Sequence, residues 1–229
     1  MILKQNRDKA IVDALKNNDL SAFENRWEDH ASRAVDSLFL FVKYSYLNGI
    51  NKQWDSWVNK NKNNPYWDSC AIDVSEDFLL NIKNAVNWYI DTQSWKHDPA
   101  YMTENQPGRV LEQCRTLHSS MWMMIGGSAI YYCLVNDIDI TPESLTSTLI
   151  KKQKDYGPNN ISRFGLNGLV IRTHDKVARI YNLLSKSGGL SNAVENESFY
   201  DTLLDIGGYA AIALMWNEGT FLTKMREDS

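Results

Sequence analysis

The chain has 229 residues, of which 43% are hydrophobic and 23% charged, a composition typical of a folded globular protein and unlike that of a disordered one. Its formal net charge of −4 argues against the uniformly basic surface that duplex nucleic acid attracts. No apolar stretch approaches the roughly 18–20 residues of a membrane span, and the amino terminus turns polar too soon for a signal peptide.

The cysteines point to a reducing compartment. Cys70, Cys114 and Cys133 are widely spaced and form neither a C-x-x-C pair nor a cluster with histidine. This spacing argues against a disulfide framework and against a structural zinc site. We therefore expect a cytoplasmic protein.

The pattern of apolar residues predicts an all-α fold. Apolar side chains recur at three- and four-residue spacing over most of the chain, only five prolines occur, and no convincing alternating strand pattern is found. In chain order we expect helices over about 21–48, 75–92, 109–134, 142–155, from 163 or 166 to 184, and 198–217.

Several helix ends carry sequence signals. Ser21 and Glu24 have the spacing of a capping box, and Thr141 followed by Pro142 is a strong helix start. The residues Tyr-Gly-Pro-Asn-Asn at 156–160 predict a turn. Two adjacent glycines at 207–208 are costly inside a helix, so we expect another helix or a ligand to approach closely there.

A polar segment with two prolines at 94–108 predicts a domain boundary. Before it, residues 1–100 form a helical extension that contains six of the eight tryptophans, which we expect to pack in the core rather than bind a ligand. After it, we expect residues 101–229 to form an all-α domain.

Positive charge is concentrated between residues 151 and 186, where eight basic and two acidic residues give a net charge of +6. Arg172, Lys176 and Arg179 share one face of a helix, so they form either a phosphate site or a surface salt-bridge face. For Lys151 and Lys152 we favour a solvated basic surface.

The last helix carries acids at a four-residue interval: Glu197, Asp201 and Asp205. Asp205 lies among apolar residues, where an unpaired carboxylate would cost several kcal/mol. Either it pairs with a cation such as Arg172 or Arg179, or it binds a divalent metal together with Asp201. Ligands that are all carboxylates favour Mg²⁺ or Mn²⁺ over zinc.

Three motifs follow one another with short gaps: K-K-Q-K-D-Y-G at 151–157, G-L-N-G-L-V-I-R-T-H-D-K-V-A-R-I at 165–180 and E-S-F-Y-D-T-L-L-D-I-G-G-Y-A at 197–210. Their order resembles the nucleotide modification associated domain 1 family of bacteriophages and bacteria, which is thought to be related to the all-α, MazG-like nucleotide pyrophosphohydrolases. The resemblance covers at most residues 109–217 and is tight over 151–210.

The resemblance implies that residues 101–229 are an all-α nucleotide-binding domain. In its helical site, acids would hold Mg²⁺ or Mn²⁺ and basic residues would hold phosphates. The catalytic candidates are Asp175, Asp201 and Asp205, and the metal candidates are Glu197, Asp201 and Asp205. The candidates for substrate binding are Asp155, Tyr156, Arg163, Arg172, Lys176 and Arg179.

The leading hypothesis is a Mg²⁺-dependent pyrophosphohydrolase that converts a (deoxy)nucleoside triphosphate to the monophosphate and pyrophosphate. Such an enzyme would control a nucleotide pool or serve DNA base modification in the cytoplasm of a phage-infected bacterium. MazG-type enzymes also carry an E-x-x-E pair, which the motif region here lacks. The alternative is therefore a non-catalytic nucleotide- or nucleic-acid-binding protein.

Two further hypotheses concern partners. The chain could be an all-helical interaction protein in which Asp205 merely pairs with an arginine. Alternatively, because MazG-like domains often complete their sites across a dimer, a homodimer could supply the missing carboxylates. Glu104 and Glu112 are candidates for them by residue type.

Overall fold

The computed structural model describes residues 25–45, 78–91, 108–187 and 197–226. Every regular element in these ranges is a helix and none is a strand, which confirms the all-α prediction. The helices are α2 (Trp27–Ser45), α4 (Phe78–Asp91), α5 (Gly108–Val135), α6 (Pro142–Tyr156), α7 (Asn159–Ser162), α8 (Gly165–Ser187) and α10 (Glu197–Asn217).

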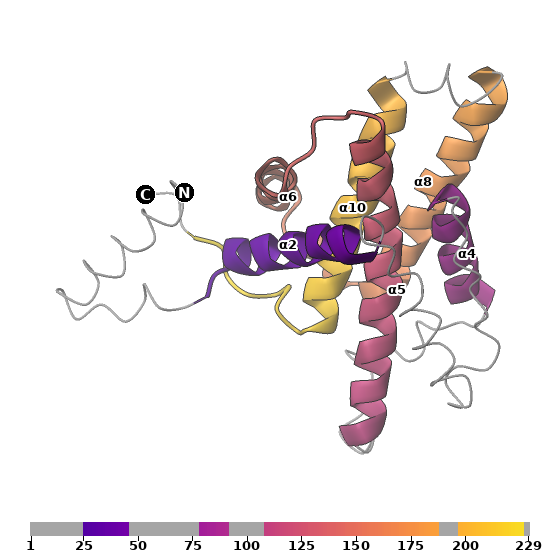
Figure 1. The fold of residues 1–229 in the computed structure, drawn as a ribbon. Coiled ribbons are helices and arrows are strands. Elements are labelled where there is room, and N and C mark those ends of the chain that lie inside the picture. The colour runs from indigo at the N-terminus through magenta and orange to yellow at the C-terminus, as the bar shows by residue number, and fades with distance from the viewer. Residues whose placement is uncertain (1–24, 46–77, 92–107, 188–196, 227–229) are drawn as a thin grey trace.

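Two long helices, α5 and α10, run side by side through the centre of the bundle (Figure 1). Helix α2 crosses both of them and also packs against α6. On the other side, α4 packs against α5 and α8, and α8 packs against α10. The short α7 links α6 to α8 and contacts the latter.

The helices form where the sequence supplies both caps and an apolar face. Thr141 caps α6: its hydroxyl accepts the backbone N–H of Ser144 at 3.1 Å, and the Ser144 hydroxyl accepts that of Thr141 at 3.0 Å. Along α2 one apolar face is buried, formed by Trp27, Ala31, Ala34, Val35, Leu38 and Val42.

A glycine allows the three central helices to meet. A Cβ atom at Gly126 of α5 would lie 2.5 Å from Cβ of Ala210 on α10 and 2.9 Å from Cδ2 of Leu38 on α2. Real side chains do not approach so closely, so only glycine permits this crossing.

Two predicted boundaries need correction. Helix α2 begins at Trp27, and Asn25 and Arg26 before it are not helical, because the Asp29 carboxylate accepts the Arg26 N–H at 3.0 Å and caps the helix there. The predicted cap at Ser21 lies outside the described residues. The predicted turn at 156–160 is shorter than expected because Asn159 already opens α7.

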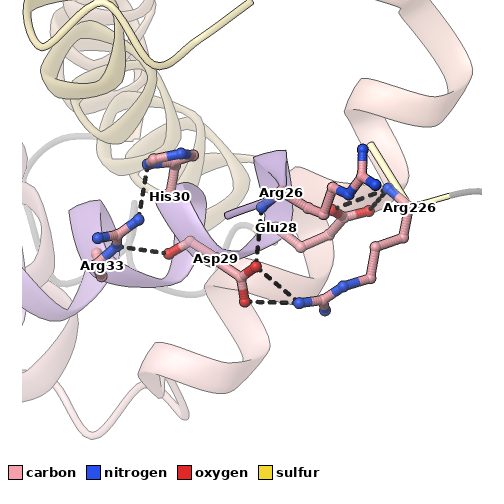
Figure 2. A network of polar contacts seen from close by, with 6 residues as sticks. All are labelled: Arg26, Glu28, Asp29, His30, Arg33 and Arg226. Carbon is pink, nitrogen blue, oxygen red and sulfur yellow. Dashed lines mark hydrogen bonds and ion pairs between the residues drawn. The ribbon is translucent and has the colours of Figure 1, made fainter. Parts of the chain in front are cut away.

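The segment after α10 returns to the start of α2 (Figure 2). The backbone N–H of Trp27 donates to the Lys224 carbonyl at 3.0 Å. Beside it, Arg226 donates from its backbone to Glu28 and from its guanidinium to both carboxylate oxygens of Asp29, at 2.8 Å each. The first turn of α2 is therefore held by the segment that follows α10, in addition to its packing against the central helices.

Helices α2 and α4, which come from the first hundred residues, share one hydrophobic core with the helices that follow. Trp27 and Trp88 are buried in that core, as predicted for the tryptophans of this part of the chain. Trp54, Trp57, Trp67 and Trp95 lie outside the described residues. The division of the chain at about residue 100 stays a prediction.

None of the helices described above combines the length and apolar character needed to cross a membrane.

Candidate functional site

Helices α6, α7, α8 and α10 surround a pocket of about 480 Å³. Its polar lining comes from Thr148, Lys152, Gln153, Tyr156, Asn160, Arg172, Lys176, Asp205 and Tyr209. Its apolar lining comes from Leu145, Leu149, Ile161, Leu204 and Ile212, with Gly208 between them.

Helical periodicity explains why these residues share one pocket. On α6 the lining residues run from Leu145 to Tyr156 at intervals of three and four, which places them on one face. On α10 the same spacing runs from Leu204 to Ile212, and on α8 Arg172 and Lys176 are one turn apart. Three helix faces thus converge on one space.

Two lysines from different helices meet on a single carboxylate in this pocket. Lys176 of α8 donates to Oδ2 of Asp205 at 2.6 Å, and Lys152 of α6 donates to Oδ1. The side chain of Asp205 on α10 is only 18% exposed, against 49% for that of Lys152 and 22% for that of Lys176. The three residues tie α6, α8 and α10 together.

Opposing effects act on the carboxyl group of Asp205. Burial alone would raise its pKa, but the hydrogen bonds and positive charges of Lys152 and Lys176 outweigh burial and hold the pKa below its ordinary value. Asp205 is therefore ionised at neutral pH.

A third cation, Arg172, completes the charged end of the pocket. Its guanidinium donates to the backbone carbonyl of Asn160 at 3.2 Å and so fixes the α7 turn against α8. Guanidinium groups carry five donors, so this bond leaves Arg172 with donors for a further acceptor.

Glycine 208 keeps the pocket open where α10 approaches α6. A Cβ atom there would lie 3.1 Å from Cδ2 of Leu149, tighter than most real contacts. The expected close approach of another helix is thereby confirmed at Gly208, whereas at Gly207 a Cβ atom would make only ordinary contacts, at 3.7 Å. The side chains of Tyr156, which is 69% exposed, and the half-buried Tyr209 lie at the same pocket.

The structure brings four of the predicted site residues together and leaves the others apart. Tyr156, Arg172, Lys176 and Asp205 line the pocket. Five other predicted residues are exposed and lie outside the pocket lining: Asp155, Arg163, Asp175, Arg179 and Asp201. The guanidinium of Arg163 lies over the Phe164 ring, 6.0 Å from its centre. The side chain of Glu197 lies outside the described residues.

One expectation about charge was wrong, and another is confirmed with different partners. Lys152 does not belong to a purely solvated surface, because it faces α10 and pairs with Asp205. Asp205 does pair with cations, but with Lys152 and Lys176 instead of Arg172 or Arg179. Arg172 bonds Asn160 instead, and Arg179 is exposed.

Sequence reasoning also missed Gln153 and Asn160. A signal for the α6 residues was present, since Lys152 and Gln153 follow Leu149 by three and four residues and share its face. No comparable signal marks Asn160, because the sequence around it predicts only a turn.

The residues around Asp205 fit a divalent metal poorly. Both carboxylate oxygens already accept hydrogen bonds from ammonium groups, and Asp201 is exposed outside the pocket lining. Within the described parts of the chain, no three His, Cys, Asp or Glu side chains are grouped so that they could hold a metal ion. The predicted Mg²⁺ or Mn²⁺ site stays a prediction.

No family model matches this chain, and neither does any curated protein or solved structure. The resemblance to the nucleotide modification associated domain 1 family therefore stays a prediction as well, and the function has to be argued from the pocket.

Proposed function

We propose that this pocket binds a nucleotide, with the phosphates at Lys152, Arg172 and Lys176 and the base against the apolar walls. The observation that carries the proposal is the meeting of two lysines from α6 and α8 inside a pocket large enough for a ligand. A volume of 480 Å³ falls within the range of about 300–1,000 Å³ that is typical of small-molecule sites.

The charge balance of the lining supports an anionic ligand. Three cations face one carboxylate, so Asp205 neutralises only part of the positive charge. Ammonium and guanidinium groups donate several charge-assisted hydrogen bonds, which suits the many acceptor oxygens of a polyphosphate.

The remaining walls of the pocket suit a ligand that carries a flat, partly apolar group next to its anionic group. Leucine and isoleucine side chains from α6, α7 and α10 line this region, and two tyrosines add aromatic surface. An aromatic base can stack on a tyrosine ring and bury its faces against such walls. A nucleotide combines both requirements in one molecule.

Binding is better supported than hydrolysis. The pyrophosphohydrolase hypothesis needs a metal that polarises the phosphate and activates water, and it assigns that metal to Asp205. Because two ammonium groups already hold the oxygens of Asp205, its contacts support a role in charge balance better than they support metal binding. Hydrolysis is the second candidate, supported by the resemblance alone.

The test is calorimetric binding of the common NTPs and dNTPs to the purified chain, in Mg²⁺ and in EDTA, with chromatography of the products. We expect binding that survives EDTA, that Lys152→Met weakens about tenfold, and that Lys151→Met leaves unchanged. Lys151 is the matched control because it is adjacent, exposed and outside the pocket lining.

Absence of binding by every nucleotide and by inorganic tripolyphosphate would refute the proposal. Equal losses in the Lys151 and Lys152 variants would also refute it, since the effect would then come from general surface charge. Release of monophosphate and pyrophosphate only in Mg²⁺ would establish the hydrolase instead.

A further inference from the structure

One side chain in the pocket has polar atoms for which the described part of the protein provides no partner. Gln153 is only 9% exposed and lines the pocket, yet its side-chain amide makes no hydrogen bond to any other described residue. The amide is not among the described polar groups that are both closed off from solvent and unpartnered, so it can meet water or a ligand at the pocket. Such a group is expected where a ligand supplies the missing hydrogen bonds.

A second amide at the same pocket also lacks a partner, here for its oxygen. The side-chain oxygen of Asn160 is inaccessible to solvent and finds no partner among the described residues. Its backbone is held in place, because Arg172 donates to its carbonyl oxygen at 3.2 Å. Gln153 and Asn160 thus belong to neighbouring elements, α6 and α7, that line one pocket.

We infer that Gln153 recognises the hydrogen-bonding edge of the ligand's heterocycle and so determines which nucleotide the pocket accepts; this inference rests on the proposed function. A glutamine amide presents one donor group beside one acceptor, the pattern that complements a base edge carrying an acceptor next to a donor. A phosphate offers acceptors alone and would leave the glutamine oxygen unpaired.

The position of Gln153 on α6 agrees with this role. It follows the cationic residue Lys152 directly and shares the pocket-facing side of the helix with Leu149 and Tyr156. An apolar side chain and an aromatic ring on the same helix face suit the faces of a flat ring, and the amide suits its edge.

The test compares Gln153→Met with the unmodified protein, because methionine has a similar length and lacks the amide. We measure the affinities of the nucleotides that bind the unmodified protein, the affinity of inorganic tripolyphosphate, and the thermal midpoint. We expect the preferred nucleotide to bind about tenfold more weakly while tripolyphosphate is unaffected. The thermal midpoint should stay unchanged, because the substitution breaks no hydrogen bond between the amide and the other described residues.

Asn182→Met on α8 is the control, since it makes a comparable change at an exposed position outside the pocket lining and should alter none of these quantities. A lower thermal midpoint in Gln153→Met, with nucleotide and tripolyphosphate affinities falling together, would overturn the inference and indicate a structural amide. If Gln153→Met still binds tripolyphosphate and selects among nucleotides as the unmodified protein does, the inference is overturned while the proposed function stands. Failure of tripolyphosphate and all nucleotides to bind the unmodified protein would refute the proposed function itself.

Discussion

At the scale of single residues, Asp205 acts as an internal counter-ion for Lys152 and Lys176. In the free protein its carboxylate provides the negative charge that the two ammonium groups require. A phosphate that enters the pocket competes with it for the same donors, so the ion pairs lower the affinity that the lysines would otherwise provide.

Asp205→Asn should therefore raise the affinity for inorganic tripolyphosphate, by about fivefold, because a competing charge-assisted interaction is lost while both lysines remain. Asp201→Asn is the matched control, since the same chemical change occurs one turn earlier at an exposed position outside the pocket lining. Calorimetry measures both affinities. Weaker binding in Asp205→Asn would mean that the carboxylate orients the lysines or holds a metal.

The lowered pKa of Asp205 also predicts how stability depends on pH. A carboxyl group whose pKa is lower in the folded state stabilises that state above its ordinary pKa of 3.8, and this contribution is lost as pH falls through the folded value. At pH 7, Asp205→Asn should cost about 1–2 kcal/mol in the free energy of unfolding. Denaturant titrations should show this difference shrink below pH 3.8; a constant difference would contradict the ion-pair explanation.

The sequence predicted these residues only in part. Asp205 stood out because a carboxylate among apolar residues of a helix requires a partner, and Lys176 because it lies in a cationic helix. Helical spacing shows which side chains share a face, but it does not show which helices face each other. The partner of Asp205 on α6, Lys152, could therefore be identified only from the packing of α6 against α10.

At the scale of helices, glycines in α5 and α10 have different roles. At Gly207 of α10 a Cβ atom would make only ordinary contacts, at 3.7 Å, with Ile130 and Leu145. At Gly126 of α5 the same atom would lie 2.5 Å from Ala210. The first position has room for a side chain, and the second has none.

Substitution of alanine at these two glycines should thus have opposite effects. Gly207→Ala should stabilise the protein by about 0.5–1 kcal/mol, because alanine favours the helix and fits. Gly126→Ala should destabilise it by about 1–3 kcal/mol, because α5 must move away from α2 and α10. Thermal and denaturant unfolding test both variants. A loss of stability in Gly207→Ala would show that Ile130 and Leu145 leave no room for a methyl group there.

Most helices followed from apolar spacing and caps, but two boundaries did not. The cap residue Thr141 and the proline after it are visible in the sequence, so α6 is predicted to within one residue at its end. The start of α2 depends on Asp29 bonding the Arg26 N–H, and α7 is a single turn that rests on α8. Short-range spacing is a weak guide to such ends, because one hydrogen bond or one tertiary contact decides them.

At the scale of the whole molecule, the segment after α10 joins the end of the described chain to α2. Phe221 is buried there, with its ring 6.4 Å from that of Trp27 and 5.9 Å from that of Trp216. Arg226 forms the polar part of the same contact through Asp29 and Glu28 (Figure 2). The apolar and the charged contact can be compared directly, since they connect the same two parts of the chain.

Phe221→Ala should destabilise the fold by about 3–5 kcal/mol, because it empties a buried aromatic position between α2 and α10. Arg226→Ala should cost less than about 1 kcal/mol, since its side chain is 59% exposed and water screens the pair with Asp29. Chemical unfolding in low and high salt separates the two contributions: the small effect of Arg226 should diminish in salt, and that of Phe221 should persist. A loss from Arg226→Ala as large as that from Phe221→Ala would mean that charge, and not the aromatic contact, holds this end of the protein to α2.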